Sequence, residues 1–365
     1  MPARRTRILA LLVAMAVAVW GPAAAMASAA DTPTLAQLIG QKLVIAMSGT
    51  TPTSSLLGRV KRGEVGGIVL FKCCNITTQT RLLATVRKLQ AAARDGGQPP
   101  LLIMADQEGG TIRTIPWAPT KYSAKQMGAN GDTAFVRGKG QATGRGLLAS
   151  GVNVDLAPVA DVAYGTSGFM YLAGRTFSTS SAKVSRLACA FAAGLADRHV
   201  VATLKHFPGI GRVKLNTDRY VQTVTASRSA LASDLAPFQA GIDQGVPMIM
   251  LSNATYTAYD SAHAAGWSKA IATTLLRGTM GFTGVSITDS LSGTAAARGV
   301  SAAGLAYRAA KAGTDMVMIT SSEAYTSRAF TYLLGKATDG YLSRATLEAS
   351  YARILALKST VAVGP

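Results

Sequence analysis

The chain has 365 residues, of which 48% are hydrophobic and 15% are charged. Its 37 lysines and arginines outnumber its 18 aspartates and glutamates, which gives a formal net charge of +19 at pH 7. This length exceeds the usual size of a single hydrophobic core but suits one α/β barrel. The basic residues are scattered and no zinc-finger or RNA-binding signature occurs, so the charge does not indicate a nucleic-acid-binding protein.

Residues 1–30 have the pattern of a cleaved secretory signal peptide. Three arginines precede the apolar run Ile8–Trp20, and small residues follow at Ala25–Ala29. The apolar run is too short to span a bilayer comfortably, and no later stretch is long and uncharged enough for a transmembrane helix. No Cys follows the run to take a lipid anchor. We therefore expect a secreted protein, extracellular or associated with the cell wall, with no membrane span.

The positive charge allows two interpretations. A basic secreted protein is attracted to polyanions, so association with an anionic cell wall is one expectation. The alternative is that the arginines and lysines simply lie on solvated faces.

Three cysteines occur in the chain, at Cys73, Cys74 and Cys189. They are too few for a disulfide scaffold and too irregular for a metal site. Two of them could pair in an oxidising compartment, which leaves one over. The connectivity stays open, and Cys189 is expected in the core because it lies on an apolar helix face.

Eight short apolar runs are spaced along the mature chain. Each is nearly continuous rather than strictly alternating, as expected when both faces of a parallel sheet are buried. The predicted strands are Leu43–Met47, Gly67–Phe71, Leu101–Ala105, Val152–Leu156, Val200–Leu204, Met248–Leu251, Val285–Thr288 and Met316–Thr320.

Segments with helical periodicity separate these runs. The predicted helices are Thr80–Arg94, Ala182–Arg198, Ser229–Gln244, Lys269–Met280, Gly304–Ala312 and Leu347–Lys358. Gly residues at helix ends suit the left-handed C′ position, and they occur at Gly151, Gly245, Gly281 and Gly313. There are eight βα units, and no change in composition marks a second domain. This pattern predicts a single (β/α)8 TIM-type barrel over residues 31–365. A doubly wound open sheet is the alternative.

Polar and ionisable residues follow most of the predicted strands. In a barrel these positions share one rim, where ligand sites form. They are Asp106–Gly110, Asp155–Asp161, Gly174–Phe177, Lys205 with His206, Ser252–Ala254 and Asp289–Ser290.

Carboxylates combined with Lys, Arg and His suit a neutral substrate rich in hydroxyl groups, because Asp and Arg bind vicinal hydroxyls with charge-assisted bonds. An ionised Asp at a strand end can also act as a nucleophile toward an anomeric carbon. The competing interpretation for Asp155 and Asp161 is that each is a helix N-cap. For Asp289, Ser290 or Ser292 could provide the cap instead, which leaves that carboxylate available for chemistry.

These segments resemble, in the same order, the motifs of the family 3 glycoside hydrolases, and specifically their single-domain β-N-acetylglucosaminidase (β-N-acetylhexosaminidase) branch. The resemblance extends from about Leu35 to Leu357. The matching segments are Gly66–Phe71, Asp106–Gly110, Asp155–Val162, Gly174–Phe177, Lys205–Gly209 and Thr288–Leu291.

The resemblance implies a (β/α)8 barrel and a retaining glycosidase without a metal or organic cofactor. Asp289 matches the family's nucleophile, which forms a covalent glycosyl-enzyme intermediate. The residues that match the family's clamp on the hydroxyls of the terminal sugar are Asp106, Arg175, Lys205 and His206.

The chain departs from the family pattern in the loop after this clamp. That branch usually has Gly-His-Gly followed by an Asp-x-His dyad whose His is the general acid/base. Here the corresponding residues are Gly209–Gly211, with Ile in the middle, and Asn216–Asp218. Asp218 therefore becomes the candidate acid/base, although Arg212, Lys214 and Arg219 are expected to lower its pKa unless burial counteracts them.

The expected function is release of terminal β-linked N-acetylglucosamine from peptidoglycan- or chitin-type oligosaccharides, by a monomer. Two alternatives remain open. One is a catalytically impaired carbohydrate-binding homologue, because Asp218 replaces the usual His. The other is a β-glucosidase-like specificity, because nothing in the sequence fixes the pocket for the 2-substituent.

Overall fold

The eight apolar runs form one parallel sheet in the computed structural model, which describes residues 32–362. The signal-peptide prediction for residues 1–30 lies outside the described residues. The strands are β1 (Leu43–Ala46), β2 (Gly67–Val69), β3 (Leu102–Ala105), β6 (Val154–Asp155), β7 (Val201–Phe207), β9 (Met248–Leu251), β12 (Val285–Thr288) and β13 (Val317–Ile319). Each position agrees with a predicted run, and β7 continues three residues beyond the predicted end at Leu204.

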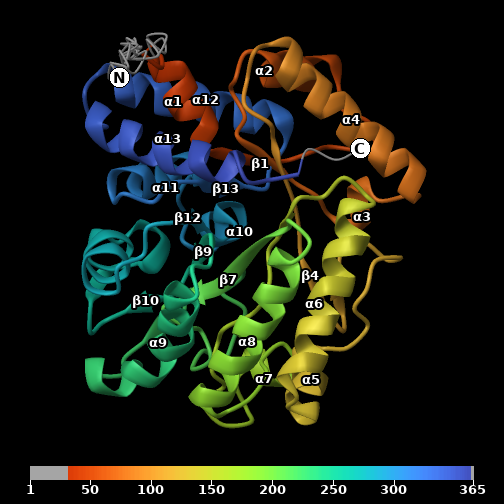
Figure 1. Ribbon diagram of the computed structural model, residues 1–365. Helices are drawn as coiled ribbons and strands as arrows, with labels where there is room; N and C mark the ends of the chain where they lie inside the picture. Colours follow the sequence, from red (N-terminus) through yellow and green to blue (C-terminus); the bar gives the residue numbers. More distant parts are fainter. Residues whose placement is uncertain (1–31, 363–365) are drawn as a thin grey trace, which may run out of the picture. The chain divides into compact units, whose positions relative to one another are not determined.

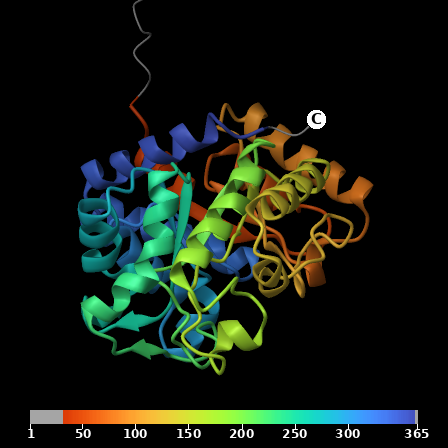
Figure 2. The ribbon, with the colours of Figure 1, turned by 60° about the horizontal axis from the view of Figure 1, so that its bottom comes forward.

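Neighbouring strands in the sheet follow the order of the chain, and β13 returns to pair with β1. The last seam, between β12 and β13, is joined by backbone hydrogen bonds from Thr288 N to Met316 O (3.1 Å) and from Met316 N to Ser286 O (2.9 Å). The sheet is thus a closed eight-stranded barrel surrounded by helices (Figure 1 and Figure 2). The barrel prediction is confirmed, and the doubly wound alternative is wrong.

The helices lie outside the barrel; α1 precedes β1, α12 and α13 follow β13, and the others lie between strands of the chain. They are α1 (Leu35–Lys42), α2 (Ser54–Lys61), α3 (Lys72–Asn75), α4 (Gln79–Asp95), α5 (Ala124–Asn130), α6 (Thr133–Leu148), α7 (Phe169–Leu172), α8 (Ser181–Ala196), α9 (Arg228–Asp243), α10 (Leu291–Ala297), α11 (Ala302–Lys311), α12 (Glu323–Thr338) and α13 (Arg344–Lys358). The predicted helix Lys269–Met280 is wound as a π-helix, η2 (Ala270–Thr279), after the 3₁₀ turn η1 (Ala265–Trp267). Among the described residues, no helix is long and apolar enough to cross a membrane.

The ends of the helices follow local sequence signals. Thr53 Oγ1 accepts a bond from Leu56 N at the start of α2, and Ser227 Oγ accepts one from Ala230 N at the start of α9. All four glycines predicted at helix ends have positive φ angles, between 75° and 91°: Gly151, Gly245, Gly281 and Gly313.

Short strands in the loops were not predicted. The loop after β3 forms a hairpin of β4 (Gln107–Gly109) and β5 (Ile112–Arg113). A second small sheet contains β8 (Thr223–Val224), β10 (Thr255–Tyr256) and β11 (Asp260–Ala264).

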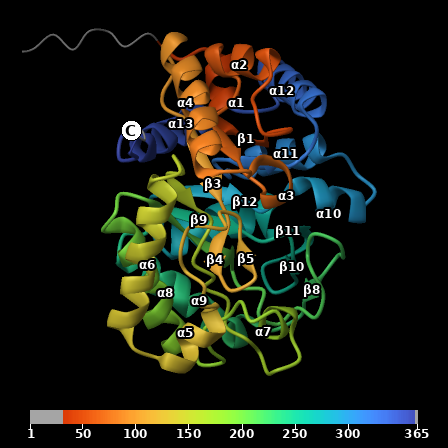
Figure 3. The same ribbon diagram turned by 90° about the vertical axis from the view of Figure 1, so that its right-hand side faces the viewer.

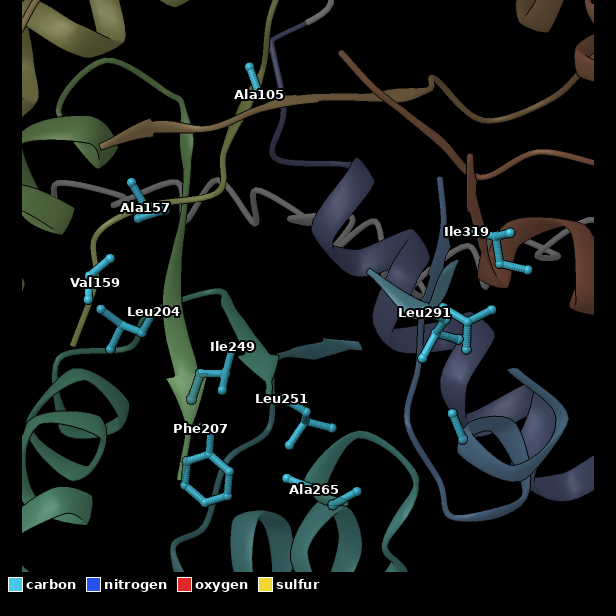
Figure 4. Close-up of a cluster of buried hydrophobic side chains, with 14 of the residues drawn as sticks. Ala105, Ala157, Val159, Leu204, Phe207, Ile249, Leu251, Ala265, Leu291 and Ile319 are labelled. Carbon is cyan, nitrogen blue, oxygen red and sulfur yellow. The ribbon is translucent and has the colours of Figure 1, made fainter. Parts of the chain in front are cut away.

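Alternation along the strands divides the core into two layers. In β1, Val44 faces the barrel interior, whereas Leu43 and Ile45 pack in the layer between strands and helices. The interior layer is rich in methionine, from Met104, Met248, Met250, Met316 and Met318. In the outer layer, Leu204, Phe207, Ile249 and Leu251 extend from β7 and β9 (Figure 4).

The cysteines show one disulfide bond. Cys73 and Cys74 are bonded to each other on α3, and Cys189 is free. The expectation that Cys189 belongs to the core is wrong, because its side chain is only half-buried on α8.

Two glycines allow α6 and α8 to pack against each other. A Cβ on Gly140 of α6 would lie 2.3 Å from Phe191 O, and one on Gly194 of α8 would lie 2.2 Å from Arg137 O. Neither position has room for a methyl group, whereas Gly138 on the same helix faces open space.

The substitutions Gly140→Ala and Gly138→Ala are therefore expected to have opposite effects. Gly140→Ala forces the helices apart and lowers the free energy of unfolding by roughly 1–3 kcal/mol. Gly138→Ala raises it by about 0.5–1 kcal/mol, because alanine favours the helix and reduces the entropy of the unfolded chain. Chemical denaturation of both variants measures these values, and equal effects would contradict the packing of α6 on α8.

Candidate active site

A cavity of about 610 Å³ opens at the carboxyl ends of the barrel strands. Its wall contains all six residues that the sequence nominated: Asp106, Arg175, Lys205, His206, Asp218 and Asp289. They come from the ends of β3, β7 and β12 and from the loops after α7 and β7. The barrel thus brings together residues that lie up to 183 positions apart in the sequence.

A β-bulge in β7 directs two consecutive side chains into the cavity. Lys205 pairs with Met250 and Phe207 pairs with Leu251, so β7 advances by two residues where β9 advances by one. His206 is the additional residue, and both Lys205 and His206 line the cavity while Phe207 packs in the outer core. A regular strand would have turned His206 to the opposite face.

Four charged side chains form a continuous cluster on one side of the cavity. Lys205 Nζ lies 2.6 Å from Asp106 Oδ1 and 2.6 Å from Glu108 Oε1. Arg175 donates two hydrogen bonds to Glu108, of 2.9 and 2.7 Å. Glu108 was part of a predicted motif but was not nominated as a site residue, because its partners are distant in sequence.

The cluster holds Glu108 and Lys205 in their charged forms. Burial opposes the carboxylate of Glu108, but Arg175 and Lys205 outweigh it and lower the pKa to about 2. Burial likewise opposes the ammonium group of Lys205, but Asp106 and Glu108 raise its pKa above the ordinary value. Both groups therefore remain ionised across the physiological pH range.

Asp161 orients the imidazole of His206. The Asp161 side chain is fully buried, and its Oδ2 lies 2.8 Å from His206 Nδ1. Its Oδ1 accepts bonds from His206 N (3.1 Å) and Ile210 N (2.8 Å). Because the carboxylate can only accept, the ring proton lies on Nδ1, and Nε2 is the ring nitrogen left to interact with a ligand.

The N-cap interpretation of Asp155 and Asp161 is wrong. Asp161 anchors the β7 loop as described, and Asp155 Oδ1 accepts a bond from Gln107 N at 3.0 Å. Asp155 is fully buried, and burial raises its pKa well above the ordinary value. Both residues thus stabilise the strand ends on which the cavity is built.

Asp218 and Asp289 form the second charged group of the cavity. Burial, followed by the repulsion of Asp289, raises the pKa of Asp218 to about 7, although His206 and Arg175 act in the opposite direction. Asp289 Oδ1 accepts a bond from Ser290 N at 2.7 Å. Near neutral pH the Asp218 carboxyl group can therefore carry a proton.

The cations of the loop do not control Asp218 as the sequence suggested. Arg212 donates bonds of 3.0 and 2.9 Å to Asp234 and stacks on Tyr164, with its guanidinium carbon 4.2 Å from the ring centroid. Lys214 and Arg219 are exposed to solvent. The lowering of the Asp218 pKa expected from these three residues does not occur, because burial counteracts it, which was the stated exception, and Asp289 adds to the increase.

Asn253, which follows β9, contacts both Asp218 and Ser290, the residue after Asp289. Its Nδ2 donates to Ser290 O at 3.0 Å and to Asp218 Oδ1 at 3.4 Å. Gly293 of α10 packs against the backbone of Asp218, since a Cβ there would lie 2.6 Å from Asp218 O. The position of Asp218 is thus fixed relative to Asp289 by contacts on two sides.

The side chains that line the cavity can bind hydroxyl groups and transfer a proton. Its ionised cluster offers donors and acceptors to a neutral polar ligand, and the Asp218–Asp289 pair offers a nucleophile beside an acid. Within residues 32–362, no group of three or more His, Cys, Asp or Glu side chains is arranged to hold a metal ion.

The chain is similar to known proteins in sequence and in fold. Residues 34–357 match the model of the glycosyl hydrolase family 3 N-terminal domain. An uncharacterized secreted glycosyl hydrolase of Arthroderma benhamiae is 32% identical over 351 residues, which cover 92% of this chain and 96% of that protein.

Two solved structures show the same fold. A family 3 β-N-acetylglucosaminidase from Paenibacillus sp. str. FPU-7 has a TM-score of 0.85 and 28% identity, and the match covers 90% of this chain and 63% of that one. The chain thus spans less than two-thirds of that protein. A β-N-acetylhexosaminidase from Beutenbergia cavernae has a TM-score of 0.82 and 30% identity, with 90% and 99% of the two chains covered.

The coupling between the two carboxyl groups predicts the effect of Asp289→Asn. This substitution removes the repulsion and lowers the pKa of Asp218, while burial keeps that pKa above the ordinary value of about 4. Titration of the Asp218 carboxyl carbon by NMR measures the shift. Asp339→Asn, at an exposed carboxylate after α12, is the control and leaves the pKa unchanged. An Asp218 pKa that stays constant or rises in Asp289→Asn would contradict the coupling.

Proposed function

The chain belongs to glycosyl hydrolase family 3, and from this premise we propose that it is a secreted, retaining glycosidase that removes terminal β-linked N-acetylglucosamine. The observation that carries the proposal is the pairing of Asp289 with Asp218, whose raised pKa of about 7 suits an acid. The two structural neighbours named as N-acetylhexosaminidases or N-acetylglucosaminidases support the sugar. The substrates are then oligosaccharides of the peptidoglycan or chitin type.

The proposed reaction has two steps. In the first, the Asp289 carboxylate attacks the anomeric carbon, the bond to the leaving oxygen breaks, and Asp218 gives its proton to that oxygen. In the second, Asp218 takes a proton from water, whose oxygen displaces Asp289 and releases the sugar. Asp106, Arg175 and the neighbouring clamp residues Lys205 and His206 hold the hydroxyls of the sugar in both steps.

The ionised cluster supports the clamp. Lys205 and Arg175 already have carboxylate partners, so their remaining donors bind neutral hydroxyl groups without leaving a buried charge unpaired.

The pattern of residues 1–30 supports secretion, as does the name of the Arthroderma relative. The proposal includes a monomer that associates with an anionic wall through the net positive charge of its mature chain, and salt-insensitive retention on isolated walls would contradict that association.

The role of Asp289 is tested with Asp289→Ala and aryl β-N-acetylglucosaminides. Loss of the nucleophile is expected to lower kcat/KM by on the order of 10⁴-fold or more. The same assay with an aryl β-glucoside separates N-acetylglucosaminidase from β-glucosidase specificity. Full activity of Asp289→Ala would refute the mechanism. A wild-type protein that binds N-acetylglucosamine without turning over either substrate would instead be the carbohydrate-binding homologue.

The role of Asp218 is tested by leaving-group dependence and pH. Asp218→Ala is expected to reduce kcat/KM by about 10²–10⁴-fold on natural oligosaccharides, and far less on aryl substrates whose leaving groups need no proton. Because a carboxyl group with a raised pKa loses its proton as the pH rises, wild-type kcat/KM on oligosaccharides falls above a pH of about 7. An equal loss on both substrate classes, or an alkaline limb that persists in Asp218→Ala, would assign the proton to another group.

A further inference from the structure

The short helix α3 carries a disulfide bond between neighbouring residues. Cys73 and Cys74 are bonded to each other with a sequence separation of 1, and both residues are exposed. They are the middle two residues of α3, which follows β2 closely in the chain. Figure 3 shows α3 and α10 on the same side of the barrel strands, as expected for segments that leave the carboxyl ends of β2 and β12.

This bond does not staple the fold. A disulfide stabilises a protein mainly by closing a long loop of the unfolded chain, and neighbouring residues enclose no such loop. It also joins no two elements of the barrel, because both of its cysteines lie on α3. Exposed disulfides without a stabilising role are the ones that small thiols open most readily. The position and exposure of the bond therefore suit reversible chemistry.

Hydrogen bonds connect the cysteines to the wall of the active-site cavity. Phe71 is the N-cap residue of α3, and it also lines that cavity. Its carbonyl oxygen accepts bonds from Cys74 N (3.1 Å) and Asn75 N (3.0 Å), and its own N donates to Asn75 Oδ1 at 2.8 Å. The disulfide thus lies inside a turn that these three bonds close, and the turn positions Phe71.

The far end of the turn is anchored. Asn75 is 1% exposed, and its Nδ2 donates to Met47 O at 2.9 Å and to Gly49 O at 2.7 Å. These bonds hold Asn75 to the segment that follows β1. Phe71, in contrast, is only partly buried. A rearrangement within α3 therefore displaces Phe71 more easily than Asn75.

The other groups near the bond, or able to react with it, point to an external thiol. Lys72 is exposed and forms no ion pair within 4.0 Å among the described residues, so its charge is available to favour a cysteine thiolate next to it. Cys189 is the remaining cysteine, and burial raises its pKa to about 11. It stays a thiol near neutral pH and is a poor attacking group.

We propose that Cys73 and Cys74 form an exchange site for low-molecular-weight thiols, and that opening their bond loosens the Phe71 wall of the cavity. A small thiolate attacks one sulfur, the S–S bond breaks, and the other cysteine leaves as a thiolate that takes up a proton. A second small thiolate attacks the small-thiol sulfur of the mixed disulfide, which releases the second cysteine. The protein gains two electrons and two protons, and the two small thiols become one disulfide.

The open state is expected to bind a ligand of the cavity more weakly. With the bond open, Phe71 occupies its binding position for only part of the time, and the apparent affinity falls by that fraction. We expect the Kd for N-acetylglucosamine to rise by about 2- to 5-fold. The choice of this sugar rests on the proposed function, whereas the exchange chemistry and the loosening of Phe71 do not.

Trapping of the folded protein tests the exchange site. Wild-type protein is incubated with reduced glutathione without denaturant and alkylated with iodoacetamide, and its peptides are analysed by mass spectrometry. Alkyl groups or glutathione are expected on Cys73 and Cys74, and oxidised glutathione is expected to restore the bond in unalkylated samples. Modification of these two residues only after denaturation would overturn the proposal.

Hydrogen exchange and calorimetry test the link to the cavity. Reduced wild-type protein is expected to exchange the Phe71 and Asn75 amides faster than oxidised protein, a measurement that needs no sugar. Calorimetry with N-acetylglucosamine then measures the change in Kd. Equal amide exchange in the two states would overturn the link, whereas absence of sugar binding in both states would count against the proposed function alone.

Matched variants assign the effect. Cys73→Ser/Cys74→Ser is expected to show the amide exchange and Kd of the reduced protein and no response to glutathione. Cys189→Ser keeps the wild-type response. Phe71→Ala is expected to bind the sugar equally in both redox states while its cysteines are still trapped. A difference in Kd that persists undiminished in Phe71→Ala would contradict transmission through this residue.

Discussion

The site depends on a buried ammonium group that is fully compensated by charge. Lys205 is nearly inaccessible to solvent, and an unpaired cation at that depth would cost several kcal/mol. Asp106 and Glu108 compensate it, and Arg175 compensates the second carboxylate in turn. Because these four residues come from β7, the loop after β3 and the loop after α7, their pairing fixes three segments around one cavity. Loss of any member would remove part of the charge compensation from a buried group.

The cavity contains two kinds of ionisable group: some keep their charge near neutral pH, and one titrates there. Mutual attraction keeps Glu108 and Lys205 ionised, because it lowers the pKa of Glu108 and raises that of Lys205. Asp218 faces the opposite situation, since burial and the like charge of Asp289 raise its pKa to about 7. Attraction therefore keeps one part of the cavity ionised, whereas burial together with repulsion gives Asp218 a carboxyl group that gains and loses a proton near neutral pH.

Much of this arrangement could be predicted from sequence, because buried parallel strands are continuous apolar runs and the polar residues that end them share one rim. The pairings could not be predicted. Glu108 and Arg175 are 67 residues apart, and only the closed barrel brings them within hydrogen-bonding distance. Whether burial or the loop cations would dominate the pKa of Asp218 could not be predicted either, since the partner of Arg212 is Asp234 of α9 and the burial of Asp218 depends on the folded loop. The bulge at His206 depends on how β7 pairs with β9. This pairing cannot be predicted from the residues around His206 alone.

The departure at Asp218 becomes intelligible in terms of pKa rather than residue type. In the family branch that the chain resembles, the loop usually provides a histidine, whose ordinary pKa of about 6.5 suits proton transfer at neutral pH. An exposed aspartate would have a pKa near 4 and would be ionised there. Asp218 is buried against α10, where Gly293 packs on the backbone of Asp218. This burial and the nearby Asp289 raise the pKa of Asp218 to about 7. In the proposed mechanism, the surroundings of Asp218 thus give a carboxyl group the proton affinity that the usual imidazole has by nature.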